Sequence, residues 1–573
     1  MRYQPLSDNR STPDAIIAAL AEGGVEFVLG MPGGLTLKLW RALHDHPSIR
    51  AVQVHEESIG ALMAEAYGRI KGRPAVVMGQ GEWIVGNAGQ AYMEALLGSS
   101  PLVILTEMTD GGSLSHHAPY QSGTGDYGNW DARGALAGVT KRVMVSLDPA
   151  QAVQHTQLAL KHAVTGQPGP VAVVFHSRAL GGQVGPQSSP AIYPTEAYTS
   201  PHGWGVDQSA LGAVVEALYR SERPVILAGN GVRLSRAKAE LDHLAQVIDA
   251  PVATTSSGKG VFAETDPLGV GVIGRFGWAT ANTIVSDADL ILAIGTKLGA
   301  SDTMNEDPAL LEPARQTMIQ IEVEPLNASW TYPMDHVLLG DAKNVMGRLA
   351  DEFESTLGRA NKDGRRRVAI SREAMTTSAS VRDDETPLNP RTIIELINRF
   401  LPDGAVITCD AGENRLFMMQ WYSVKPGDEY LQPAAGGGMG YAVPAAMAAR
   451  LAWPDRTVLA VCGDGGFEMS IHALSSALQE RLPIAVLVLN NGALGWVLHG
   501  MGEEAVAARF EDRDYARIAR SLGCDGIRTE SASELEEALS KIGNLTIPLV
   551  IDVPTSLSTT YNELDQTLLQ KGA

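Results

Sequence analysis

Residues 457–466 read TVLAVCGDGG and residues 483–491 read PIAVLVLNN, and these two stretches decide the fold class. Each is a short, continuous apolar run that ends in glycine or in polar residues. This pattern is typical of strands that are buried on both faces of a parallel sheet. The residues between the two runs suffice for one crossover helix, so we expect the strands to be parallel neighbours whose carboxyl ends lie at the same edge.

Buried-strand patterns of the same kind recur along the chain, separated by helical stretches. They read VEFVLG, RPAVVMG, SPLVILT and GPVAVVF in the first third, PVILAGNG, ADLILAIG and TMIQIEVEP in the middle, and AVITCD and PLVIDV near the end. A chain of 573 residues has the length of three or four domains, at a prior of about 150 residues each. The sequence predicts three doubly wound α/β domains with parallel sheets, at residues 1–180, 205–350 and 388–573.

Two stretches without such patterns separate these domains. Residues 181–204 are rich in Gly, Pro, Ser and Gln, which predicts a linker that crosses the surface. Residues 355–390 are polar and include the run Arg365–Arg367, for which we expect a solvated linker. Anion binding by the arginines is the alternative.

Composition excludes several classes of protein. The chain has 45 Lys and Arg against 65 Asp and Glu, a formal charge of −20, which disfavours nucleic acid and anionic membrane surfaces as partners. A hydrophobic content of 45% with 19% charged residues is typical of a folded globular protein. Three cysteines are too few for a disulfide framework, so a reducing cytoplasm is the expected location. No signal peptide and no membrane-spanning run is predicted.

The edge of the predicted third sheet brings together residues that suit a metal ion. Asp464 follows the first of the two opening strands and Asn491 follows the second. Carboxylate, amide and backbone carbonyl oxygens are ligands that Mg²⁺ or Ca²⁺ accepts, with a phosphate and water completing the shell. Gly465 and Gly466, at a helix N-terminus, would offer N–H groups to that phosphate. A simple turn with an N-cap aspartate is the alternative for Gly-Asp-Gly alone.

This pairing resembles the Gly-Asp-Gly to Asn-Asn motif of thiamine-diphosphate enzymes. Over nearly its whole length the chain is similar to the superfamily of acetolactate synthase, benzaldehyde lyase and 2-oxo acid decarboxylase. The resemblance implies thiamine diphosphate and Mg²⁺ as cofactors, and a domain order of pyrimidine-binding, middle and diphosphate-binding. It also implies that Asp464, Asn491 and the Ala493 carbonyl hold the metal and that Gly465 and Gly466 hold the diphosphate.

A loop before this motif resembles another cofactor-binding segment of the family. Residues 409–414 read CDAGEN and follow the strand AVIT. The resemblance implies that Gly412, Glu413 and Asn414 contact the cofactor at its diphosphate. An ordinary acidic turn is the alternative.

The segment GGGMGY at residues 436–441 resembles the part of the family fold that grips the aminopyrimidine ring. Glycines let a backbone approach a ring closely. The resemblance implies that the Gly437 carbonyl accepts a hydrogen bond from the 4′-amine, and that Met439 is the apolar wedge that bends the cofactor. Plain core packing is the alternative for Met439.

In the first domain, HEE at residues 55–57 precedes the Ala-rich stretch SIGALMAEAYGR. The family pattern places a catalytic glutamate eight residues before an acidic residue, and counting back from Glu65 selects Glu57. Glu56 is the adjacent alternative. A buried carboxylate at this point would protonate N1′ of the aminopyrimidine, so that the 4′-amine becomes a base for the C2 proton.

A loop after the strand SPLVILT supplies three further catalytic candidates. Gln121 falls near the position of an active-site glutamine in acetolactate synthases and benzaldehyde lyases, which implies a role in orienting the substrate carbonyl. His116 and His117 resemble the paired histidines of pyruvate decarboxylases, which implies a proton relay. Exposed or structural histidines are the alternative.

The chain departs from the family at residues 81–87, which read GEWIVGN where synthases carry Ser-Gly-Pro-Gly-Ala-Thr-Asn. Glu82 and Trp83 would reshape the acceptor pocket or merely pack it. Gln80 occupies the place of a catalytic histidine in benzoylformate decarboxylase. An unusual substrate is therefore expected.

The resemblance implies an acetolactate-synthase-like carboligase or a decarboxylase that acts on 2-oxo acids through a C2 ylid and an enamine. One alternative is a thiamine-diphosphate lyase of 2-hydroxy ketones or 2-hydroxyacyl-CoA, and a second is a non-catalytic cofactor-binding scaffold. The resemblance also implies a homodimer or homotetramer, with the cofactor between the first domain of one subunit and the third domain of another.

Overall fold

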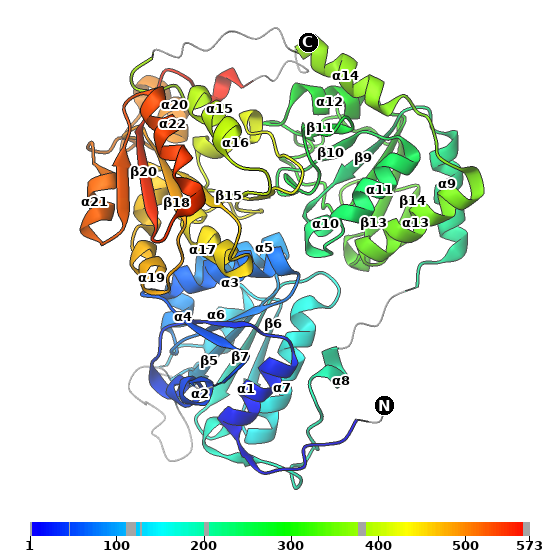
Figure 1. Cartoon of the computed structure of the whole chain (residues 1–573). Helices are drawn as coiled ribbons and strands as arrows, with labels where there is room; N and C mark the ends of the chain where they lie inside the picture. Colours follow the sequence, from blue (N-terminus) through cyan, green and yellow to red (C-terminus); the bar gives the residue numbers. More distant parts are fainter. Residues whose placement is uncertain are drawn as a thin grey trace. The chain divides into compact units, whose positions relative to one another are not determined.

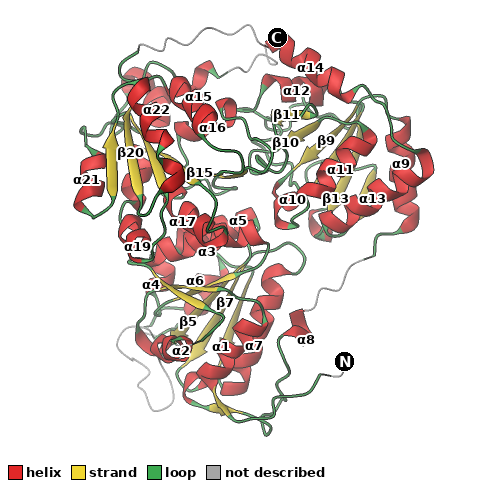
Figure 2. Cartoon of the chain, in the orientation of Figure 1, coloured by secondary structure: helices red, strands yellow, loops and turns green. Residues whose placement is uncertain are grey.

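The computed structural model describes residues 3–44, 46–109, 122–126, 129–199, 205–375 and 385–564. The chain separates into two compact units (Figures 1 and 2). The first unit consists of Met1–His202, Met447–Ala452 and Ser475–Glu480, and the second of Gly203–Ala446, Trp453–Leu474 and Arg481–Ala573. The described residues form three six-stranded sheets and a two-stranded ribbon.

All strand pairs within the three large sheets are parallel. The prediction of three α/β domains with parallel sheets is confirmed. The exact domain bounds stay predictions.

The first unit holds the sheet β3-β2-β4-β5-β7-β6. Its strands are β2 (Phe27–Gly30), β3 (Arg50–Gln53), β4 (Ala75–Met78), β5 (Leu102–Met108), β6 (Arg142–Ser146) and β7 (Pro170–His176), and β1 (Arg10–Ser11) pairs with β8 (Gln183–Val184) in the ribbon. Its helices are α1 (Thr12–Glu22), α2 (Leu37–Leu43), α3 (Glu57–Lys71), α4 (Trp83–Gly86), α5 (Gly89–Gly98), α6 (Ala132–Ala137), α7 (Pro149–Val164) and α8 (Glu196–Thr199).

Local signals in the sequence set the ends of α1. The Ser11 hydroxyl accepts a hydrogen bond from the Asp14 N–H, Pro13 lies in the first turn, and Gly23 follows the last helical residue. These are the N-cap, first-turn and C-cap preferences of helices. Helix α1 packs beside α7, and α7 packs on β7 (Figure 1).

The second unit contains two sheets, and the first of them has the order β11-β10-β9-β12-β13-β14. Its strands are β9 (Pro224–Ala228), β10 (Val252–Thr254), β11 (Gly269–Val272), β12 (Leu290–Ile294), β13 (Thr317–Glu322) and β14 (His336–Leu339). The accompanying helices are α9 (Gln208–Arg220), α10 (Asn230–Leu234), α11 (Lys238–Ile248), α12 (Ala279–Ser286), α13 (Ala342–Leu357) and α14 (Gly364–Met375).

The other sheet of the second unit has the order β16-β15-β17-β18-β20-β19. Its strands are β15 (Val406–Cys409), β16 (Glu429–Leu431), β17 (Val458–Gly463), β18 (Ala485–Asn490), β19 (Asp525–Arg528) and β20 (Leu549–Pro554). The helices that follow the chain through this region are α15 (Pro390–Phe400), α16 (Glu413–Trp421), α17 (Ala442–Ala452), α18 (Asp464–Ser470), α19 (Ala473–Gln479), α20 (Gly495–Met501), α21 (Tyr515–Ser521) and α22 (Ala532–Ser540). Strands β17 and β18 are adjacent and parallel, as predicted.

Both predicted linkers contain regular structure, so these two predictions are wrong in part. Residues 181–204 include β8 and α8. Within residues 355–390 the basic run starts α14, where Arg365 pairs with Asp249 at 3.3 Å and Arg367 donates to the Pro224 carbonyl at 3.1 Å. These contacts explain why so polar a segment is helical, because its arginines bond to the preceding domain.

A buried ion pair in the second unit fixes the end of α16. Lys259 is fully buried and donates to Glu264 Oε2 at 2.6 Å and to the Tyr422 carbonyl at 2.8 Å. The Trp278 indole N–H donates to the Met419 carbonyl at 2.7 Å. Helix α16, which begins with Glu413, is therefore held in place from its carboxyl end.

Among the residues described, no helix has the length and apolar character needed to cross a bilayer.

Candidate cofactor site

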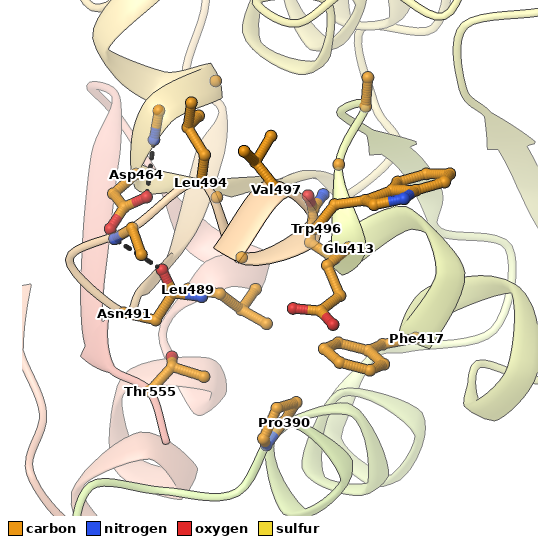
Figure 3. Close-up of a pocket in the computed structure, with 18 of the residues that line it drawn as sticks. Pro390, Glu413, Phe417, Asp464, Leu489, Asn491, Leu494, Trp496, Val497 and Thr555 are labelled. Carbon is orange, nitrogen blue, oxygen red and sulfur yellow. Dashed lines mark hydrogen bonds between the residues drawn. The ribbon is translucent and has the colours of Figure 1, made fainter. Parts of the chain in front are cut away.

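A pocket lies at the carboxyl edge of the third sheet, where β15, β17 and β18 end (Figure 3). Ligands of open parallel sheets bind at this edge. The residues that line the pocket are Pro390, Ala411, Gly412, Glu413, Asn414, Phe417, Met439, Gly463, Asp464, Gly465, Gly466, Leu489, Asn491, Ala493, Leu494, Gly495, Trp496, Val497, Thr555 and Ser556. Every site residue predicted in the third domain except Gly437 is among them.

Asp464 is the first residue of α18 and is 2% exposed. Its Oδ1 accepts the Gly465 N–H at 2.7 Å and its Oδ2 accepts the Gly492 N–H at 2.6 Å. Burial raises the pKa of this carboxyl to about 6, although the backbone N–H groups oppose the rise. No ion pair to Asp464 is present among the described side chains, so a bound cation would supply the missing opposite charge.

The two asparagines after β18 have different roles. Asn490 donates to Asp552 Oδ1 and to the Arg513 carbonyl, both at 2.9 Å, so it is tied to the fold. Asn491 lines the pocket, and its Oδ1 accepts the Ala493 N–H at 3.0 Å. Asp464 and Asn491 lie on the same side of the pocket in Figure 3. Only the second asparagine is therefore available to a ligand.

The donor set fits Mg²⁺ bound together with a phosphate. Asp464 gives one carboxylate and Asn491 one amide oxygen, and these hard oxygen ligands leave positions for phosphate oxygens and water. No three His, Cys, Asp or Glu side chains form a metal-ligand group in the described ranges. A metal at this edge would therefore depend on Asp464 and on the phosphate that it binds.

A second buried aspartate, Asp410, holds the glycine-rich segment against the sheet edge. Its Oδ1 accepts N–H bonds from Ala411 at 2.8 Å and from Gly440 at 2.9 Å, and its Oδ2 accepts from Ala442 at 3.2 Å. A Cβ on Gly466 would lie 2.9 Å from the Asp410 carboxyl carbon, so glycine is required there. The sequence analysis did not predict these hydrogen bonds of Asp410, although the residue directly follows a predicted strand.

The start of α16 supplies three predicted residues to the lining of the pocket, namely its N-cap Gly412 and its first two residues, Glu413 and Asn414. Gly412 has φ of +116°, a conformation that a side chain would strain, and it is the N-cap of α16. The Asn414 amide donates to the Asp410 carbonyl at 3.1 Å. Glu413 is 5% exposed and lies across the pocket from Asp464 (Figure 3).

Met439 lines the pocket, whereas Gly437 does not. Gly437 has φ of +69° and lies in the segment that Asp410 holds through Gly440. The predicted roles of Met439 and Gly437 toward an aminopyrimidine ring stay predictions.

Glu57 lies in the first unit, at the start of α3, and is 5% exposed. Its Oε2 accepts a hydrogen bond from the Asn87 amide at 2.8 Å. Glu56, the alternative acid, is the N-cap of α3, where its side chain accepts the Ser58 N–H at 3.0 Å. Glu56 therefore caps the helix, whereas Glu57 does not, and the choice of Glu57 as the catalytic acid stays a prediction. Asn87 was not predicted as a site residue, although it matches the asparagine that ends the family segment compared with residues 81–87.

Another buried acid, Glu107, lies at the end of β5. It is fully buried, its Oε1 accepts the Leu35 N–H at 3.2 Å, and its Oε2 has no hydrogen-bond partner in the described part of the chain. Burial raises its pKa to about 8, the charge of Glu82 adds to the rise, and the Leu35 and Thr36 N–H groups oppose it. This carboxyl is protonated at neutral pH.

We expect Glu107 to make stability depend on pH. Its folded-state pKa of about 8 exceeds the ordinary value of 4.5, so its contribution is complete below pH 4.5 and is lost as the pH rises through 8. Each pKa unit corresponds to about 1.4 kcal/mol, so the loss amounts to a few kcal/mol. The thermal unfolding temperature of wild type should fall as the pH rises over this range. In Glu107→Gln, which does not titrate at this position, the unfolding temperature should depend less on pH. An equally steep decline in the variant would contradict the assignment.

The candidates His116, His117 and Gln121 lie outside the described residues. The chain departs from the family at Glu82 and Trp83. Glu82 is the N-cap of α4, and Trp83 is its first residue. The Trp83 side chain is 50% exposed in the first unit, so it does not simply fill the core.

Comparisons with known proteins agree with this arrangement. Residues 10–126 match the N-terminal thiamine pyrophosphate binding domain of thiamine pyrophosphate enzymes, residues 211–349 match their central domain, and residues 410–553 match their C-terminal thiamine pyrophosphate binding domain. The chain belongs to the thiamine-diphosphate-dependent enzyme superfamily, and it is an enzyme of that class.

Several curated proteins are similar over nearly the whole chain. A probable acetolactate synthase large subunit of Methanocaldococcus jannaschii is 28% identical, over 94% of this chain and 91% of that protein. The acetolactate synthase large subunit of Haemophilus influenzae is 26% identical, over 94% and 93%. A probable 2-ketoarginine decarboxylase of Pseudomonas aeruginosa is 29% identical, over 92% and 90%. These relatives thus include acetolactate synthase large subunits and a probable 2-ketoarginine decarboxylase.

Proposed function

We propose that this protein is a Mg²⁺- and thiamine-diphosphate-dependent enzyme that acts on small 2-oxo acids as a decarboxylase or an acetolactate-synthase-like carboligase. The observation that carries the proposal is the pocket in which Asp464, Asn491, Gly465 and Gly466 meet at one sheet edge. The matched cofactor-binding domains and the similarity to acetolactate synthases and to a 2-oxo acid decarboxylase support it.

In this proposal the third domain holds the charged end of the cofactor. Asp464, Asn491 and the Ala493 carbonyl would hold Mg²⁺, which would neutralise the charge of the diphosphate. The first residues of α18 and α16 line the same pocket, and helix N-termini favour phosphate groups. Trp496, Val497 and Leu494 form an apolar wall of the pocket. Such a wall excludes water and strengthens the contacts to the diphosphate.

The first domain supplies the acid. When bound, the cofactor provides a carbon nucleophile at its thiazolium C2 and an electron sink for the loss of carbon dioxide. Glu57 holds or releases the proton at N1′ of the aminopyrimidine, and a positioned acid of this kind contributes about 10²- to 10⁴-fold. Because Asn87 bonds to Oε2, Oε1 of Glu57 would be the atom that exchanges this proton.

We expect Asn87→Ala to lower turnover about 10- to 100-fold, because a hydrogen bond to a charged group is worth about 1.5–3 kcal/mol. The affinity for thiamine diphosphate should stay within about threefold of wild type, since most cofactor contacts lie in the third domain. Steady-state kinetics and cofactor titration measure the two quantities. A loss of affinity as large as the loss of turnover would contradict the positioning role.

The alternative of a 2-hydroxyacyl-CoA lyase receives less support. It would use the Arg365–Arg367 run for CoA phosphates, but Arg365 pairs with Asp249 and Arg367 bonds to a backbone carbonyl. The lyase of 2-hydroxy ketones remains the second candidate, because it needs the same cofactor site.

We further propose that the enzyme is a homodimer or homotetramer in the cytoplasm. The proposed oligomeric state rests on the family resemblance, which implies that one subunit's first domain and another's third domain share a cofactor. The proposed cytoplasmic location rests on the cysteines, which are free and buried: Cys409, Cys462 and Cys524. Sedimentation of the purified protein with and without cofactor tests the assembly.

Carbon dioxide release from a panel of 2-oxo acids, with thiamine diphosphate and Mg²⁺ added, tests the reaction. Release from at least one member, with an aldehyde or a 2-hydroxy ketone as product, would support the proposal and separate decarboxylase from carboligase. Binding of the cofactor without release from any member would shift the weight to the lyase of 2-hydroxy ketones.

A further inference from the structure

Glu413 places a carboxyl group in the pocket to which we assign the cofactor diphosphate. Its side chain is 5% exposed, and its carboxylate lies across the pocket from Asp464 (Figure 3). An unpaired carboxylate there would repel a diphosphate, and in a buried site that repulsion is large. The residue that neutralises this charge therefore decides whether the pocket accepts an anion.

His499, on α20, is that residue. Its Nδ1 lies 2.8 Å from Glu413 Oε1, and the ring is also largely buried, with 11% of the side chain exposed. No other cationic side chain is within ion-pair distance of Glu413 in the described ranges. Burial raises the pKa of Glu413, and the hydrogen bond from His499 opposes that rise.

The other partners of the pair fix where its protons lie. His499 Nε2 is 3.2 Å from the Leu557 carbonyl, which only accepts, so Nε2 carries a proton. Glu413 Oε1 also accepts the Tyr561 N–H at 2.8 Å. One further proton lies between Nδ1 and Oε1. Whichever atom holds that proton, the pair is neutral as a whole.

We propose that His499 is a positioning residue for cofactor binding: it neutralises Glu413, and thereby lets a carboxyl-lined pocket accept the diphosphate. This inference rests on the proposed function. It gives α20 a role in binding, because Gly495 at its start lies against Glu413, where an added Cβ would be 2.5 Å from Oε2. Sequence spacing does not suggest the pair, since its members are 86 positions apart.

Cofactor titration of four proteins tests the proposal: wild type, His499→Gln, Glu413→Gln and the double variant. The fluorescence of Trp496 in the pocket wall reports binding of thiamine diphosphate with Mg²⁺, and of inorganic pyrophosphate with Mg²⁺, without turnover. We expect His499→Gln to raise Kd about 10- to 100-fold, because it leaves a buried carboxylate unpaired. Glu413→Gln should bind at least as tightly as wild type, and the double variant should return to within about threefold of wild type.

Rescue by the second substitution separates charge compensation from a structural role. A His499 that merely packs α20 would give a loss that Glu413→Gln does not repair, which would overturn the inference. Weaker binding in Glu413→Gln alone would also overturn it, because Glu413 would then contact the cofactor or metal favourably. This single variant decides the question even if His499→Gln fails to fold. Absence of binding by wild type would overturn the proposed function together with the inference, whereas binding without rescue overturns the inference alone.

Discussion

Replacing Glu57 by glutamine should lower turnover about 100-fold or more while thiamine diphosphate still binds. Glutamine keeps the size of the side chain and a carbonyl oxygen that accepts from Asn87, but it cannot deliver a proton to N1′. The effect should appear in kcat with little change in cofactor affinity, since we assign the binding of Mg²⁺ and the diphosphate to the third domain. Steady-state rates and cofactor titration on the same preparation measure both.

Glu56→Gln is the matched control, because the two acids are adjacent and only Glu56 caps α3. This control should lower stability by about 1 kcal/mol and change kcat less than about threefold. Equal losses of turnover in the two variants would mean that the assignment of Glu57 as the acid is wrong.

Replacing Asp464 by alanine should weaken Mg²⁺-dependent binding of thiamine diphosphate about 100-fold or more. The substitution removes the only carboxylate among the proposed metal ligands, whereas loss of a supporting group alone costs about 10- to 100-fold in metal affinity. Isothermal titration with Mg²⁺ present, and again with chelator, separates metal-dependent from metal-independent binding.

Asn490 and Asn491 offer a matched pair for this measurement. Asn491→Ala should weaken binding in the same way as Asp464→Ala, because Asn491 lines the pocket. Asn490→Ala should instead lower the thermal unfolding temperature and leave affinity within about threefold, because Asn490 bonds to Asp552. Stronger loss of affinity in Asn490→Ala than in Asn491→Ala would reverse our assignment of the metal ligand.

Most of the buried strands were predictable and the edge strands were not. Strands such as β5, β17 and β18 are covered on both faces, so they appear in the sequence as continuous apolar runs. The buried three-residue strand β10 also went unpredicted, although it lies inside its sheet. The other unpredicted strands of the three large sheets, β3, β6, β11, β14, β16 and β19, lie at sheet edges. Most of these are partly exposed and carry polar residues, as in RAVQ and DGIR, which leave no apolar run to recognise.

Part of the candidate site was likewise predictable from the sequence and part was not. Asp464 and Asn491 follow buried strands directly, so topology alone brings them to one edge. The Asn87 to Glu57 bond and the His499 to Glu413 pair join residues 30 and 86 positions apart through tertiary packing. No spacing in the sequence marks such contacts. The buried Glu107 also went unpredicted, because a single acid at the end of an apolar run is indistinguishable from a turn residue.

Exchange of the C2 proton of bound thiamine diphosphate for deuterium tests the central claim most directly, because it needs no knowledge of the substrate. Proton NMR of cofactor recovered after quenching measures the rate with Mg²⁺ present. We predict that wild type accelerates exchange far beyond the rate of free cofactor and that Glu57→Gln loses about 100-fold or more of that acceleration. Exchange by wild type at the rate of free cofactor, with binding demonstrated, would show that Glu57 does not activate the cofactor.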